Sequence, residues 1–216
     1  MPALPRFIAF TGVDDPALAD GLVALSARYP IEWGILVDDD RADEQLFPAR
    51  ADRERLVTLR GLRWAAHVCG AQARAIADDP AAATIDLTGF ARMQVNHGFG
   101  GSTKTQVGNV VAFAERRRIR ALLQCQGDFP DDTRLDWLFD VSFGTGIRPD
   151  RWPAPSTHFC GYSGGIGPAN AAEVVTAIAA PVDGDYWIDM ESGVRTDGRF
   201  DLDKCAAVCR AVYGAR

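Results

Sequence analysis

The sequence predicts an α/β protein of the (β/α)8 (TIM) barrel type, formed by a single domain over residues 1–216. Eight short runs of β character alternate with helical patterns along the chain, which is typical of parallel β/α architecture. The runs are apolar throughout rather than alternating, as expected for strands covered on both faces. The last two runs end in small residues, where a barrel of this type binds phosphate groups. A doubly wound open sheet is the alternative arrangement.

Composition limits the class of protein. The chain is 47% hydrophobic and 24% charged, which suits one compact domain with a substantial core. The net charge of -6 argues against a general nucleic-acid binder. No apolar run approaches the roughly 20 residues of a membrane helix, and a signal-peptide pattern is lacking. The five cysteines include no CxxC pair, so neither a disulfide scaffold nor a structural zinc site is expected. We therefore expect a cytoplasmic enzyme-sized domain.

The amino-terminal half supplies four predicted strands. They cover residues 6–11, 32–37, 64–69 and 92–96. A helix is expected after the first strand, where Asp14 or Asp15 can cap it and Pro16 suits its first position. Further helices are expected over residues 52–60 and directly after Gly70.

The carboxyl-terminal half supplies the other four strands. They cover residues 120–125, 136–141, 158–161 and 187–190, with helices over 105–118 and 201–213. Residues 126–135 are too few and too broken for a helix. We therefore expect a loop to replace the helix between strands five and six, and residues 144–146 to open a Pro-rich loop before strand seven.

Two strand ends near the carboxyl terminus predict a phosphate site. Gly164 and Gly165 follow the seventh strand, before a helix expected to begin at Pro168, and Ser192 and Gly193 repeat this design after the eighth. Glycines let the backbone approach an anion closely, and a helix start offers free N–H groups and a favourable dipole. The alternative interpretation is that these residues form tight turns only.

Several of these segments resemble motifs of the phosphoribosylanthranilate isomerase family. Residues 161–170 resemble its GGL-x-P-x-N element, and residues 189–194, Asp-Met-Glu-Ser-Gly-Val, are similar to its D-x-x-SGVE strand. Asp140 with residues 144–146 resembles its D…GGTG segment, and residues 96–98 resemble its QLHG. The similarity spans much of the chain and is sharpest over its last third.

The resemblance implies a barrel enzyme of tryptophan biosynthesis that performs an Amadori rearrangement on a phosphoribosylated aromatic amine. This reaction needs an acid that protonates the ribose ring oxygen and a base that removes the C2 proton. Asp140 occupies the position of the family's acid, after strand six. The family's base is a cysteine in a K-x-C-G motif on strand one, where this chain has Thr11, followed by Gly12.

The same resemblance implies which residues contact the substrate. Arg50, in Pro48-Ala49-Arg50, is the nearest equivalent of the family's carboxylate-binding arginine. His97 and Gly144 are expected to contact the substrate. No cofactor is implied.

The residue that acts as base stays open. A threonine hydroxyl is too weak a base at neutral pH without an activating partner, although Thr11 can still donate or accept a hydrogen bond. Three strand-end residues are possible substitutes, each with a structural role as the alternative: Asp38, Cys69 and Glu191. No metal site is predicted, because the polar residues that could meet at one rim show no metal-ligand spacing: His67, Cys69, His97 and Asp140.

Two hypotheses for function follow. The first is a phosphoribosylanthranilate isomerase-like enzyme that acts on a phosphorylated sugar-type molecule, with the standard isomerisation left open because Thr11 replaces the base. The second is a catalytically inactive barrel that binds a phosphorylated ligand. A desolvated Asp140 in a cleft would favour the enzyme, and an Asp140 held in a turn would favour the binding protein. No nucleic-acid or membrane partner is expected, and the sequence does not predict the oligomeric state.

Overall fold

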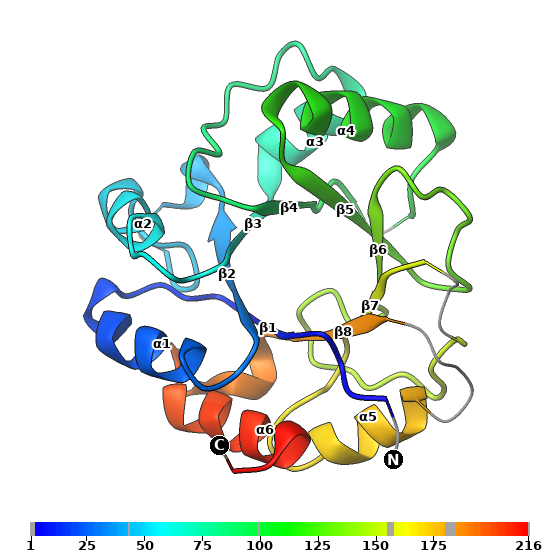
Figure 1. The fold of residues 1–216 in the computed structure, drawn as a ribbon. Helices are drawn as coiled ribbons and strands as arrows, with labels where there is room; N and C mark the ends of the chain where they lie inside the picture. The colour runs from blue at the N-terminus through cyan, green and yellow to red at the C-terminus, as the bar shows by residue number, and fades with distance from the viewer. Residues whose placement is uncertain (1–2, 43, 99, 155–157, 180–184, 216) are drawn as a thin grey trace.

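A computed structural model describes residues 3–42, 44–98, 100–154, 158–179 and 185–215. Eight parallel strands form a closed barrel in the order in which they follow along the chain (Figure 1). The first strand pairs with both the second and the eighth, so the sheet closes on itself. The predicted (β/α)8 barrel is therefore confirmed, and the open sheet is excluded.

The barrel strands are short and lie close to the predicted runs. They are β1 (Ile8–Thr11), β2 (Ile31–Val37), β3 (Trp64–Val68), β4 (Arg92–Val95), β5 (Arg120–Cys125), β6 (Asp136–Phe139), β7 (Cys160–Tyr162) and β8 (Tyr186–Met190). Parallel pairing brings the carboxyl ends of all the strands to one rim, where barrels of this kind carry their active sites.

Six α-helices of the described chain lie outside the ring of strands in Figure 1. They are α1 (Ala19–Ser26), α2 (Arg50–Val57), α3 (Gly70–Asp78), α4 (Lys104–Arg117), α5 (Ala171–Ala179) and α6 (Leu202–Tyr213). None of these helices is long and apolar enough to cross a membrane.

The connections on either side of β6 contain no α-helix within the described residues. The absence of a helix between β5 and β6 was predicted. The described part of the β6–β7 connection also lacks an α-helix. Aromatic side chains from these connections pack against Tyr162 of β7, with ring centroids 5.3 Å away for Phe129 and 6.0 Å for Trp152. They cover strands that a helix would otherwise cover.

The starts of several helices follow from local side-chain bonds. Asp15 accepts a hydrogen bond from the backbone N–H of Ala17 and caps a 3-10 turn, η1 (Pro16–Leu18), which runs into α1, as predicted. Thr103 and Gln106 form a capping box at α4. A second 3-10 turn, η2 (Asp39–Arg41), follows β2.

Two predicted helix starts differ from the structure. The helix after β7 begins at Ala171 rather than at Pro168, because Asn170 holds the preceding turn through its side chain. After β8 there is only one 3-10 turn, η3 (Ser192–Val194), and a hairpin, β9 (Arg195–Thr196) and β10 (Arg199–Phe200), precedes α6. A helix does follow β8, as predicted over 201–213, but the turn at Ser192 and Gly193 does not start it.

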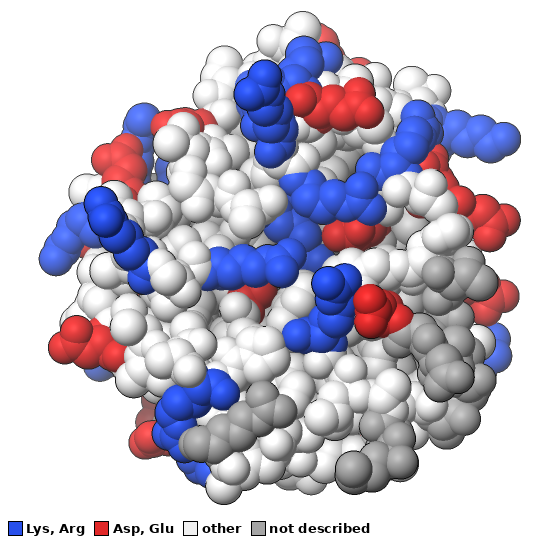
Figure 2. Space-filling view, in the orientation of Figure 1, with Lys and Arg blue, Asp and Glu red and all other residues white. Residues whose placement is uncertain are grey.

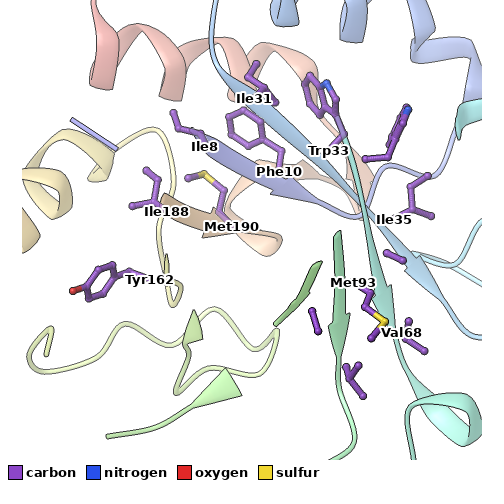
Figure 3. Close-up of a cluster of buried hydrophobic side chains, with 14 of the residues drawn as sticks. Ile8, Phe10, Ile31, Trp33, Ile35, Val68, Met93, Tyr162, Ile188 and Met190 are labelled. Carbon is purple, nitrogen blue, oxygen red and sulfur yellow. The ribbon is translucent and has the colours of Figure 1, made fainter. Parts of the chain in front are cut away.

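Side chains of the strands divide between two cores. Ile8, Phe10 and Trp33 lie on the helix side of the strands and belong to the large outer cluster (Figure 3). Inside the barrel, Trp187 fills the centre, and a Cβ on Gly161 would lie only 2.1 Å from its ring. A large indole therefore packs where a neighbouring strand has no side chain.

The interior also buries polar groups at both of its ends, which the expectation of uniformly apolar runs missed. At the amino end, Arg92 of β4 lies 2.5 Å from Glu32 of β2 and 3.5 Å from Asp136 of β6. These strands are not neighbours, so the contacts cross the barrel interior. On the face shown in Figure 2, Lys and Arg side chains lie across the middle with Asp and Glu beside them.

Candidate functional site

The carboxyl ends of the strands surround a cavity of about 410 Å³. Each strand, or the residue directly after it, supplies a lining residue: Thr11, Leu36, His67, Gln94, Gln124, Asp140, Ser163 and Asp189. Most of these side chains carry a hydroxyl, amide, imidazole or carboxyl group. The floor of the cavity is therefore polar, in contrast to the apolar centre of the barrel beneath it.

A second hollow of about 250 Å³ adjoins this cavity at the loops after β6, β7 and β8. Four residues line both spaces, which therefore lie side by side: Gly146, Gly165, Ile166 and Ser192. Gly193 lines the smaller hollow, and Gly164 lines the larger cavity. The fold thus brings together the four residues predicted to bind phosphate.

Close packing of these loops requires their glycines. A Cβ on Gly193 would lie 2.0 Å from the carbonyl oxygen of Ile166, and one on Gly146 would lie 2.7 Å from Oγ of Ser192. Gly165 has a φ of +60°, which disfavours other residues. The tight-turn interpretation therefore holds for these positions, and it does not exclude a ligand.

Unpaired backbone donors accompany the glycines. Within the described chain, the N–H groups of Gly164, Gly165, Ser192 and Gly193 have no hydrogen-bond acceptor. The side chain of Asn170 forms hydrogen bonds with other backbone groups of this loop: it accepts from the N–H of Gly167 and donates to the carbonyl of Gly165. Free N–H groups beside a hollow can bind an anion or water.

Asp140 lies just after β6 and is 4% exposed. Its Oδ1 accepts hydrogen bonds from the N–H and hydroxyl of Ser142, at 2.7 and 2.8 Å, and from the N–H of Phe143. Its Oδ2 accepts from Nε2 of Gln124 at 2.9 Å. Asp140 therefore lines the cavity and is also held in a turn, so its position alone does not separate the two hypotheses.

Thr11 ends β1 and is 1% exposed. Its hydroxyl donates to Oδ1 of Asp189 at 3.1 Å and lies 3.3 Å from Nε2 of His67. Burial raises the pKa of Asp189 to about 8. Burial, together with the charge of Arg92, lowers the pKa of His67 to about 3. Thr11, at the position of the family's base, therefore contacts two buried titratable side chains, Asp189 and His67.

The three proposed substitutes for the base differ in their surroundings. Glu191 is half-buried and lines the cavity, and its carboxylate accepts no hydrogen bond from the described residues. Burial raises its pKa, and Arg195 opposes this effect. Burial also raises the pKa of the Cys69 thiol, which disfavours a reactive thiolate. Asp38 accepts from the N–H of Asp40 and does not line the cavity.

The predicted substrate contacts are only partly brought together. His97 and Gly144 line the cavity, and Nε2 of His97 lies 2.8 Å from Oγ of Ser102. Arg50 does not line it, because its exposed side chain donates to Glu54 on the same helix. Among the described residues, no group of three or more His, Cys, Asp or Glu side chains is placed to hold a metal ion.

Several lining residues were missed from the sequence. Arg41 of the 3-10 turn η2 and Arg74 of α3 line the cavity in place of Arg50. Asp189 belonged to a recognised motif without being assigned a role, and His67 was considered only as a metal ligand. The available signal was a polar residue near the carboxyl end of a strand, in Trp-Ala-Ala-His-Val and Tyr-Trp-Ile-Asp-Met.

Solved structures share this fold, although no protein-family model and no curated protein matches the sequence. The N-(5'-phosphoribosyl)anthranilate isomerase of Pyrococcus furiosus has a TM-score of 0.63 and 13% identity, over 97% of this chain and 100% of that chain. Its counterpart from Thermococcus kodakaraensis has a TM-score of 0.57 and 14% identity, over 97% and 100% of the two chains.

A decarboxylase has a related fold. Orotidine 5'-monophosphate decarboxylase of Methanocaldococcus jannaschii, in complex with the inhibitor BMP, has a TM-score of 0.53 and 10% identity, over 98% of this chain and 100% of that chain. The chain therefore has the barrel fold of phosphoribosylanthranilate isomerases. Identities this low show the fold and leave the reaction open.

Proposed function

We propose that the protein is a barrel enzyme that binds a phosphorylated sugar-type molecule and isomerises it by proton transfer. The observation that carries this proposal is that two spaces lie side by side and share lining residues. A cavity with buried carboxyl and imidazole groups adjoins a hollow beside four unpaired backbone N–H groups. One ligand can therefore place its phosphate at the loops and its reacting carbons over the polar floor.

The phosphate end rests on the loops after β7 and β8. In our proposal, the N–H groups of Gly164, Gly165, Ser192 and Gly193 donate to phosphate oxygens. No lysine or arginine is needed at this end, because backbone donors in glycine-rich turns bind phosphate in many barrel enzymes.

The opposite end of the cavity carries two exposed guanidinium groups. Arg41 donates to Glu44 at 2.8 Å and lies 4.2 Å over the ring of Phe47. Arg74 has no ion pair within the described chain. Guanidinium groups pair well with carboxylates, so we propose that a ligand carboxylate lies at this end. Arg41 would then take the role that the resemblance assigned to Arg50.

A second candidate function is a barrel that binds the phosphorylated ligand without catalysis. It is favoured by Asp140, whose two carboxylate oxygens already accept hydrogen bonds from Ser142, Phe143 and Gln124. An acid must donate a proton in the Amadori rearrangement, and a carboxylate held in this way must first rearrange. The two candidates share the ligand and differ in turnover.

Two measurements separate these candidates. Calorimetric titration of the purified protein with inorganic phosphate and ribose 5-phosphate tests the ligand. Turnover of phosphoribosylanthranilate, followed by loss of its fluorescence, tests the reaction, with Asp140→Asn beside the wild type. The enzyme requires binding and a turnover that Asp140→Asn abolishes. Binding without turnover of this substrate would leave the non-catalytic candidate, and absence of binding would contradict both.

A further inference from the structure

The structure assigns a proton-transfer role to Asp189. Thr11 and His67 form a hydrogen-bonded pair beside it, in which the donor and acceptor roles can reverse. We propose that Asp189 exchanges a proton with the bound ligand in place of the family's base, and that Thr11 and His67 are positioning residues that stabilise both of its protonation states. This inference rests on the proposed function for the identity of the ligand, but not for the behaviour of the three side chains.

The three side chains form a built site. They come from β1, β3 and β8, and each is at least 95% buried while lining the cavity. Oγ1 of Thr11 lies 3.1 and 3.4 Å from the two oxygens of Asp189 and 3.3 Å from Nε2 of His67. No other side chain of the described residues donates a hydrogen bond to Asp189.

Contact between β1 and β3 requires a gap in the strand between them. Gly34 of β2 supplies this gap, because a Cβ there would lie 2.8 Å from Oγ1 of Thr11 and 2.9 Å from Nε2 of His67. Gly34 pairs with Thr11 in the sheet register. Gly34 therefore has a specific structural role: it allows two side chains on non-adjacent strands to come into contact.

A hydroxyl has one proton to donate and two lone pairs that accept, so Thr11 can serve Asp189 in two ways. With Asp189 ionised, Thr11 donates to the carboxylate, and His67 donates to Thr11 through a protonated Nε2. With Asp189 protonated, its O–H donates to Thr11, and Thr11 donates to Nε2 of His67. The second arrangement requires the imidazole proton on Nδ1. The tautomer of His67 therefore follows the protonation of Asp189.

Burial keeps the exchanged proton on Asp189 rather than on His67, and the charge of Arg92 opposes this effect at Asp189. Arg92 faces both groups from below, and Asp140 and Glu32 face Asp189 across the barrel. Burial raises the pKa of Asp189 to about 8 and lowers that of His67 to about 3. At neutral pH the imidazole is therefore uncharged, and Asp189 is the group that titrates near the working pH of an enzyme.

The proposed step balances with protein groups alone. A C–H bond of the ligand breaks, its electron pair stays on the ligand carbon, and the proton forms an O–H bond on ionised Asp189. Thr11 then changes from donor to acceptor toward Asp189. Return of the same proton to a different ligand atom completes an isomerisation and regenerates the carboxylate.

Nuclear magnetic resonance tests the pair without any ligand. The chain contains three histidines, so the ¹⁵N signals of His67 can be assigned by their loss in His67→Gln. In wild type and Thr11→Ser, we expect the His67 nitrogens to change between the two tautomers with the same midpoint as the ¹³Cγ signal of Asp189. In Thr11→Val, which removes only the hydroxyl, the His67 signals should no longer follow Asp189. Wild-type His67 signals that stay constant through the Asp189 titration would contradict the proposal that the tautomer of His67 follows the protonation of Asp189.

Ribose 5-phosphate and inorganic phosphate test the contact with the ligand. Both should shift the amide signals of Gly165 and Gly193, but only the sugar phosphate should move the titration midpoint of Asp189. If ribose 5-phosphate binds and leaves that midpoint unchanged, Asp189 does not contact the ligand and its catalytic role is wrong. If neither compound shifts the glycine amides, the proposed function fails, while the tautomer experiment still decides whether the pair exists.

Discussion

Gly34 leaves room for His67 inside the barrel, since a Cβ on Gly34 would lie 2.9 Å from Nε2 of His67 and would have to displace the imidazole. β2, which carries Gly34, separates β1 from β3 in the sheet. A side chain at this position would block the contact between Thr11 and His67. The glycine in β2 is therefore explained by the contact between two polar side chains on the floor of the cavity.

The first prediction concerns Gly34→Ala. The added methyl group must displace Thr11 or His67, and overpacking of a core costs roughly 1–3 kcal/mol in the free energy of unfolding. We expect a loss of this size in urea titrations, together with shifted ¹⁵N signals of His67. Gly108→Ala is the matched control, because it lies in α4 with open space around it and should stabilise the helix by up to about 1 kcal/mol. Equal stability of Gly34→Ala and wild type would contradict the crowding.

The second prediction concerns stability at alkaline pH. The folded pKa of Asp189, about 8, lies above its ordinary value of 3.8, so its contribution to stability is lost as pH rises through 8. The folded pKa of His67, about 3, lies below 6.5, so its contribution is lost only as pH falls below 6.5. Between pH 6.5 and 8 the Asp189 effect is therefore separate from the His67 effect, with a slope of at most about 1.4 kcal/mol per pH unit.

Asp189→Asn isolates this effect. The neutral amide keeps the shape of the side chain and removes its titration. We expect the free energy of unfolding of wild type, measured in urea, to fall from pH 6.5 to 9 and that of Asp189→Asn to fall less. Parallel curves for the two proteins would show that the carboxyl group titrates at its ordinary value.

The barrel itself was predictable from the sequence. Helix patterns and turn residues such as Pro16 separate eight buried runs, and parallel strands covered on both sides leave few other architectures. The apolar strand sequences did not reveal which side chains point into the barrel. His67 and Asp189 each stand alone in an apolar strand, and only the closed ring brings them to one floor.

Individual site residues were harder to predict, because motif spacing does not fix the direction of a side chain. Arg50 and Arg41 both follow β2, but Arg50 lies on the first turn of α2 and faces solvent. The glycines after β7 and β8 were easier, since backbone groups depend little on rotamers. Their roles as phosphate ligands stay a prediction.

The third prediction concerns the phosphate hollow. In Gly193→Ala, a Cβ would lie 2.0 Å from the carbonyl oxygen of Ile166, so the loops after β7 and β8 must separate. Separated loops no longer aim their N–H groups at one anion, and we expect the affinity for inorganic phosphate to fall at least about tenfold, or about 1.4 kcal/mol. Gly127→Ala, in a loop outside the cavity with open space, is the control and should bind phosphate as wild type does. Unchanged binding by Gly193→Ala would argue against this site.

The fourth prediction concerns Arg195, which ties the β8 loop to the β1 loop. Its side chain is 8% exposed, donates to the carbonyl of Gly12, and pairs with Asp14 at 2.6 Å. Arg195→Met leaves Asp14 partly buried without its partner, and we expect a loss of roughly 2–4 kcal/mol in the free energy of unfolding. The pKa of Glu191 should rise further, because Arg195 opposes the effect of burial on that group. A ¹³C titration of Glu191 that is identical in both proteins would exclude this coupling.

The fifth prediction separates Arg41 from Arg50. The two side chains are both exposed and both pair with a glutamate of their own segment, Glu44 and Glu54, but only Arg41 lines the cavity. If the ligand carries a carboxylate opposite its phosphate, Arg41→Gln removes a charge-assisted pair and Arg50→Gln does not. A carboxylate pair near solvent contributes about 1 kcal/mol, so we expect a three- to tenfold weaker affinity for a carboxylated sugar phosphate in Arg41→Gln alone.

A ligand comparison shows whether the effect arises at the carboxylate. Ribose 5-phosphate lacks this group, so its affinity should be the same in wild type, Arg41→Gln and Arg50→Gln. Calorimetric titration with phosphoribosylanthranilate, or with a stable reduced analogue that keeps the carboxylate, should distinguish only Arg41→Gln. Weaker binding of both ligands to Arg41→Gln would instead indicate that Arg41 holds its loop over the cavity, since it also packs against Phe47. A selective loss in Arg50→Gln would mean that α2 moves toward the ligand on binding.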